Sequence, residues 1–104
     1  MRAQQATEVS ADDVRELDLY AENTEELYGQ FKSIIANIQR RIAKGTYNPA
    51  LAPKLWRYWY DEAARRYKRE FGTSDWSFPV AVRQAAAEAR AVEEFEAITR
   101  GEYA

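Results

Sequence analysis

Apolar residues recur along most of the chain at intervals that place them on one face of a helix. The clearest series comprises Leu27, Phe31, Ile34, Ile35, Ile38 and Ile42. Its spacing is the 3.6-residue period of an amphipathic helix, and its length of about twenty residues favours a helix over a strand. Asn23, with Glu26 three residues later, predicts the start of this helix, and Gly45 predicts its end.

A shorter helix is expected before it, near residues 11–21. Ser10 followed three residues later by Asp13 resembles a capping box, with Asp in place of the usual Glu. The apolar positions Val14, Leu17 and Tyr20 provide one modest stripe.

Two further helices follow. Pro49 or Pro53 can occupy the first turn of a helix that runs to Phe71 and stops at Gly72. The last helix is predicted from about residue 79 to Arg100. Its expected core stripe comprises Val82, Ala85, Ala86, Ala89, Val92, Phe95 and Ile98.

These patterns predict an all-α fold, a compact single-domain bundle of about four helices, one short and three long. The second, third and fourth helices are expected to form the core. Residues 1–9 lack periodicity and are expected to be a flexible segment, which leaves residues 10–104 as one helical domain.

The third predicted helix contains an unusual stretch, KLWRYWYDEAARRYKREF, at residues 54–71. On a helical wheel, most of its aromatic residues share one arc and are core candidates. That arc holds Ala52, Leu55, Trp56, Trp59, Tyr60, Ala63, Ala64, Tyr67 and Phe71. Tyr58 is the exception, because it lies in the middle of the opposite, charged arc.

Charge is segregated along the chain, although the formal net charge is only −2. Residues 1–26 carry eight acidic and two basic side chains, whereas residues 27–69 carry ten basic and two acidic ones. Residues 70–104 are acidic again, with seven acidic and three basic side chains. The middle of the chain therefore predicts a basic face that the overall charge conceals. The candidate partner- or phosphate-binding residues are Arg40, Arg41, Lys44, Lys54, Arg57, Tyr58, Arg65, Lys68 and Arg69.

Three interpretations of this face remain open. The acids of the N-terminal segment, or those of the last helix, can lie beside it and offset its charge. A protein partner with an acidic patch, or a second copy in a homodimer, can bind it. Nucleic-acid phosphate can bind it, with Tyr58 or Tyr47 stacking on a base. If the acidic first helix covers Tyr58, the nucleic-acid hypothesis loses its site.

Catalytic chemistry is poorly represented. The chain has neither cysteine nor histidine, which excludes disulfides, thiolate nucleophiles and imidazole bases. Asp61 and Glu62 are adjacent and point about 100° apart on a helix, which makes them a poor acid–base pair. The carboxylates of Glu22, Glu25 and Glu26 share a face, but such clusters are usually solvated. We therefore expect no enzymatic activity, no cofactor and no metal site.

No membrane association is expected either, because no apolar run approaches the ~20 residues that a membrane span needs. No signal-peptide core follows the N-terminus, and the expected compartment is the cytoplasm.

Three segments carry a resemblance to other sequences. They are ENTEELYGQFKSIIANIQRRIAKGTYNPALAPKLWRYWYDEAARRYKREFG, then FPVAVR, then EEFEAITRGEYA. Together they resemble a group of small uncharacterised proteins found in bacterial genomes and in phages or other mobile elements. The shared pattern is ELY at a helix start, K-G-x-Y-[DN] at its stop, a K-L-x-x-Y-x-x-x-x-A-[AK]-x-x-Y helix, and F-P before a helix ending near G-x-Y.

The resemblance spans Leu17 to Tyr103, with departures. Members usually have Leu-Val where this chain has Trp59 and Tyr60, and histidines typical of the linker are absent. It implies a shared helical fold and a mobile-element accessory role, with no mechanism and no functional residues. Small proteins of such elements often bind and disable a host defence complex, so inhibition of this kind is an expectation by analogy.

Overall fold

The computed structural model describes residues 9–72 and 78–103, and this part of the chain is helical with no strand. Its elements are α2 (Ala11–Glu22), α3 (Glu25–Lys44), α4 (Ala52–Phe71) and α5 (Val80–Thr99). The all-α prediction of one short and three long helices is confirmed. The expected flexible segment 1–9 lies outside the described residues except for Val9. None of the four helices is long and apolar enough to cross a membrane.

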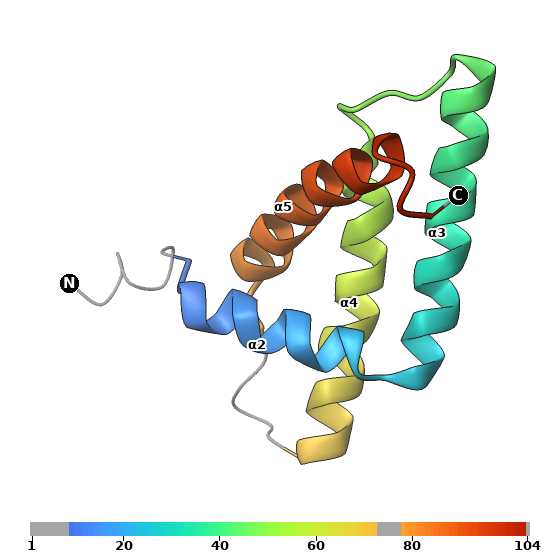
Figure 1. The fold of residues 1–104 in the computed structure, drawn as a ribbon. Coiled ribbons are helices and arrows are strands. Elements are labelled where there is room, and N and C mark those ends of the chain that lie inside the picture. Colours follow the sequence, from blue (N-terminus) through green and yellow to red (C-terminus); the bar gives the residue numbers. More distant parts are fainter. Residues whose placement is uncertain (1–8, 73–77, 104) are drawn as a thin grey trace.

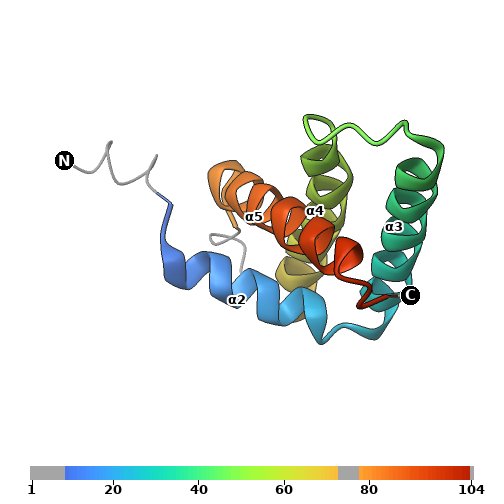
Figure 2. The ribbon, with the colours of Figure 1, turned by 45° about the horizontal axis from the view of Figure 1, so that its top comes forward.

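The helices form a bundle that α2 closes at one end. In Figures 1 and 2, α3 and α4 run antiparallel and are joined at one end by residues 45–51, while α2 crosses the other end. The most extensive helix–helix contact is between α4 and α5, and α2 contacts both of them more extensively than α3 does. The three long helices contribute to the core as predicted, and the short helix α2 adds Leu17 and Ala21 to it, which the prediction left out.

The helix ends follow the local signals at most positions. Ser10 caps α2 by accepting a hydrogen bond from the Asp13 amide at 3.4 Å. Gly45 and Gly72 end α3 and α4 in the left-handed conformation, with φ of 74° and 63°, which glycine adopts without strain. Pro53, rather than Pro49, lies in the first turn of α4.

The predicted cap of α3 is wrong by one residue. Thr24, not Asn23, precedes the helix, and its side chain does not cap it. The Asn23 side chain is used by the preceding helix, since its amide nitrogen donates to the Leu19 carbonyl at 2.8 Å. Thr24 likewise donates backwards, to the Tyr20 carbonyl at 2.7 Å.

The aromatic side of α4 is the centre of the core. Trp56, Trp59 and Tyr60 are buried, and the ring of Phe31 on α3 packs against both tryptophans with centroids 5.2 and 5.4 Å away. Trp59 also donates from Nε1 to the Leu27 carbonyl at 2.8 Å. Burying one such ring is worth about 2–3 kcal/mol by area transfer, so this cluster holds α3 against α4.

Phe71 is a correction to the predicted core. It is the last residue of α4 and is 55% exposed. Its ring packs instead against the rings of Tyr67 and Tyr20, with centroids 4.6 and 6.3 Å away.

The buried face of α5 also differs from the predicted stripe. Val82 and Ala86 are buried as expected, but Ala89 and Val92 are exposed. Two charged residues, Arg90 and Glu94, take the buried positions instead. The helix can turn this face inward because the two charges pair with each other and Arg90 also pairs with two acids of α2.

Candidate binding surface

Local hydrogen bonds fix the connection between α3 and α4. The Thr46 amide donates to the Arg41 carbonyl at 2.8 Å, which closes the end of α3. Asn48 then forms a turn by accepting from the Ala50 amide at 2.9 Å. The ring of Tyr47 stacks on Phe95 of α5, with centroids 4.9 Å apart and planes 8° apart. The connection is therefore anchored at both its start and its middle.

A groove of about 390 Å³ opens beside this connection. We call it the α3–α4 groove, and its lining residues are Arg41, Thr46, Tyr47, Asn48, Leu51, Ala52, Lys54, Leu55 and Tyr58. Three residues of the predicted basic face, Arg41, Lys54 and Tyr58, meet here. Tyr58 is 73% exposed and Leu51 is 53% exposed, so two large apolar groups face solvent between cations.

Several cations at this end of the molecule have no acidic partner among the described residues. Within residues 9–72 and 78–103, no carboxylate pairs with Arg40, Arg41, Lys44 or Lys54. Arg41 donates a hydrogen bond from Nε to the neutral side-chain oxygen of Asn37, one turn earlier in α3, at 2.8 Å. Arg41 and Lys44 also lie in the last turn of α3, where positive charge complements the helix dipole. These side chains are therefore available to an external anion.

The other residues of the predicted face lie elsewhere. Arg57 is half-buried and pairs with Asp61 at 2.9 Å, while Arg65 pairs with Glu62 at 2.6 Å. Lys68 and Arg69 occupy the last turn of α4, about 15 Å along the helix from Tyr58 at 1.5 Å per residue. The predicted face is therefore not continuous. Arg41, Lys54 and Tyr58 line the α3–α4 groove, Arg57 and Arg65 pair with acids of their own helix, and the last two cations lie at the far end of α4.

Asp61 explains why the middle of the face is not free. It accepts from Arg57 and, at 2.6 Å, from Arg83 of α5. Burial disfavours the ionised carboxyl, but the two arginines outweigh it and hold the pKa of Asp61 below its ordinary value. Arg57 also donates to Gln84 at 2.8 Å, so its guanidinium is used in joining α4 to α5.

The acidic first helix does not cover the groove. It crosses the opposite end of α4 from the connection, as both ribbon views show. There Glu16 accepts from the Tyr67 hydroxyl at 2.5 Å, and this hydrogen bond, with some burial, raises the pKa of Tyr67 to about 12. Tyr58 remains exposed, so both binding hypotheses keep their site.

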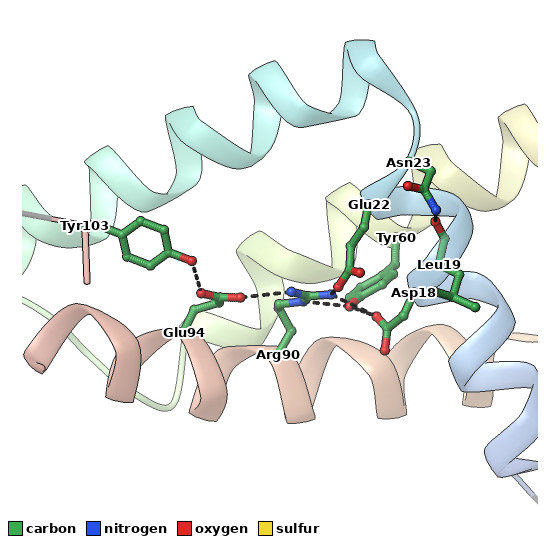
Figure 3. A network of polar contacts seen from close by, with 8 residues as sticks. All are labelled: Asp18, Leu19, Glu22, Asn23, Tyr60, Arg90, Glu94 and Tyr103. Carbon is green, nitrogen blue, oxygen red and sulfur yellow. Dashed lines mark hydrogen bonds and ion pairs between the residues drawn. The ribbon is translucent and has the colours of Figure 1, made fainter. Parts of the chain in front are cut away.

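Two acids of α2, Asp18 and Glu22, converge instead on one buried arginine of α5 (Figure 3). Arg90 donates from Nη2 to Glu22 at 2.5 Å and to Asp18 at 3.1 Å. It also donates from Nη1 to Glu94 and from Nε to the Tyr60 hydroxyl, both at 2.9 Å. This arginine therefore joins α2 and α4 to α5.

The groups around Arg90 are themselves connected. Tyr60 donates to Asp18, and Tyr103, beyond the end of α5, donates to Glu94 at 2.5 Å. Burial, followed by the neighbouring carboxylates, raises the pKa of both tyrosines. Burial works against the charge of Arg90, but Tyr60, Glu22 and Glu94 outweigh it and raise its pKa. The arginine stays charged and both hydroxyls stay protonated at neutral pH.

Sequence reasoning missed this network, although a signal was present. Arg90 follows the alanine-rich start of the last helix, and Glu94 stands four residues later. An arginine and a glutamate four residues apart lie on the same face of a helix and can pair, and here that face also carries small residues. The acidic first helix then supplies the remaining partners.

The described part of the chain offers no group of three or more acidic side chains arranged to hold a metal ion. No protein-family model, curated protein or solved structure matches the chain. Inferences about function therefore start from the surface geometry.

Proposed function

We propose that this is a small non-enzymatic binding protein that docks a protein partner through the α3–α4 groove. The observation that carries the proposal is that exposed Tyr58 and Leu51 lie beside Arg41 and Lys54, two cations with no acidic partner in the described part of the chain. Tyrosine and arginine are the residues enriched at the energetic centres of protein interfaces. The partner surface is expected to be acidic around an apolar centre.

One feature favours a protein over a nucleic acid. Tyr47, the second candidate for base stacking, already has one ring face against Phe95. Nucleic-acid binding is the competing hypothesis, and the nuclease experiment described below tests it.

The resemblance to phage and mobile-element proteins extends this proposal to a biological role. An accessory protein of this size acts by stoichiometric binding, and masking a surface of a host defence complex is one such action. The connection that lines the groove is held by hydrogen bonds at Thr46 and Asn48 and by the stacking of Tyr47 on Phe95. This supports the role, since preorganised surfaces lose less entropy when they bind.

Charge reversal tests the location of the surface. Arg41→Glu/Lys54→Glu is expected to reduce capture of the partner from host lysate by more than about tenfold, since two attractive contacts become repulsive. The matched control, Lys68→Glu/Arg69→Glu, changes the same number of exposed charges at the far end of α4. It is expected to capture the same protein as the wild type. Circular dichroism checks that both variants fold.

Equal capture by all three proteins would contradict the proposed surface. A nuclease treatment separates the competing class. If capture disappears with nuclease, and the protein binds labelled DNA or RNA with a steep salt dependence, the groove is a phosphate site and not a protein-docking surface.

A further inference from the structure

A second pocket, of opposite charge to the groove, lies beside Arg90. It has a volume of about 210 Å³ and is bounded by helices α2, α3, α4 and α5, and by Tyr103 beyond the end of α5. Its lining includes four aromatic side chains, Tyr28, Phe31, Trp59 and Tyr103. Tyr28 and Tyr103 are 55% and 39% exposed, so their rings lie where a solute can reach them.

Negative charge exceeds positive charge around this pocket. The guanidinium of Arg90 is surrounded by three carboxylates, those of Asp18, Glu22 and Glu94. Glu94 has both oxygens occupied, one by Arg90 and the other by Tyr103. Glu22 uses Oε2 for Arg90, but its Oε1 makes no hydrogen bond within residues 9–72 and 78–103, and its side chain is 47% exposed. Lys32 lies 5.1 Å from the centre of the Tyr28 ring but does not line the pocket.

Arg90 is itself an organic cation that lies against aromatic rings of this pocket. The Arg90 guanidinium lies 5.4 Å from the centre of the Trp59 ring and 5.8 Å from that of Phe31. These distances are within the roughly 6 Å range of cation–π attraction. Carboxylates and aromatic ring faces therefore hold one guanidinium here. The open pocket beside Arg90 is lined by the same two kinds of group, the Glu22 carboxylate and the rings of Tyr28 and Tyr103.

We propose that this pocket binds an organic cation, an alkylammonium or alkylguanidinium group, with Glu22 as its ionic partner and the Tyr28 and Tyr103 rings as its walls. Aromatic surfaces with a nearby carboxylate are the usual receptors for such groups. The negative faces of the rings and the carboxylate attract the cation and compensate for the water that it loses on binding. Both free polyamines and the lysine or arginine side chains of a peptide carry the required group.

The test uses n-butylguanidinium as the probe and n-butylurea, its neutral isostere, as the matched ligand control. Binding is followed by NMR chemical shifts of the protein on titration. The cation is expected to give a saturable shift that butylurea does not give. Tyr28→Ala and Glu22→Gln are each expected to weaken binding by about fivefold or more, since each removes one of the two attractive components. Glu25→Gln, an exposed acid at the start of α3, is expected to change nothing.

Testing both Tyr28→Ala and Glu22→Gln separates a loss of binding from a loss of folding. Glu22→Gln also removes a contact to Arg90, whereas Tyr28 is exposed and its ring stacks on Phe31 and lies below Lys32, outside the Arg90 network. The proposal is overturned if no saturable shift appears, if butylurea binds equally well, or if Tyr28→Ala binds like the wild type. Titrations with spermidine and with a short arginine peptide identify the natural source by their relative affinities. None of these measurements involves the α3–α4 groove.

Discussion

Replacement of Arg90 by alanine is expected to lower the free energy of unfolding by about 3–5 kcal/mol, the usual effect of removing one partner from a buried ion pair. The guanidinium is the cation at the centre of Asp18, Glu22 and Glu94, and it also satisfies the Tyr60 hydroxyl. Without it, the buried Glu94 carboxylate has no counter-charge, and α2 loses its ionic attachment to α5. Urea unfolding followed by circular dichroism measures the loss.

Two controls make this result specific. Arg100→Ala removes an arginine whose pair with Glu102 is exposed, and surface pairs contribute only about 0–1 kcal/mol. Adding Glu94→Gln to Arg90→Ala is expected to recover part of the stability, because it removes the uncompensated buried charge. A loss of stability for Arg90→Ala no larger than that for Arg100→Ala would show that the network contributes little.

Tyr58→Ala is expected to weaken binding of the captured partner by about thirtyfold or more, which corresponds to the 2 kcal/mol threshold of an interface hot spot. The ring is 73% exposed beside Leu51 and the groove cations, so it can be buried almost completely by a docking surface. Its loss is expected to leave stability within about 0.5 kcal/mol, as for most surface substitutions. Isothermal titration calorimetry with the purified partner measures the affinity.

Phe71→Ala is the matched control for this prediction. Phe71 is another exposed aromatic residue on α4, at the end distant from the groove, and is 55% exposed. Its replacement is expected to leave the affinity unchanged. If Phe71→Ala weakens binding as much as Tyr58→Ala does, or if neither changes it, then the groove is not the energetic centre of the interface.

Elements of this fold are predictable from the sequence where a single local rule applies. The period from Leu27 to Ile42 specifies α3, the glycines at 45 and 72 specify two helix ends, and the helical wheel places Trp56 and Trp59 inside. The same wheel places Tyr58 outside, and the structure leaves it exposed. Each of these features depends on residues within one helix.

The main feature that escaped prediction, the burial of Arg90, depends on contacts between distant segments. Arg90 can be buried on α5 because Asp18 and Glu22 approach from a helix some seventy residues earlier. Other misses come from competing local contacts. Asn23 fails as a cap for α3 because its side chain bonds to the Leu19 carbonyl of the preceding helix. The basic residues of α4 are not one free face because Arg57 and Arg65 pair with Asp61 and Glu62 of the same helix.

The most direct test of the α3–α4 groove as a docking surface is site-specific photo-crosslinking. A photoreactive phenylalanine analogue is introduced in place of Tyr58 in one sample and in place of Phe71 in another. Irradiation in host lysate is expected to give a discrete, nuclease-resistant protein adduct from position 58 that excess wild-type protein suppresses, and no such adduct from position 71. An adduct from position 71 alone, or a nuclease-sensitive adduct from position 58, would contradict protein docking at this groove.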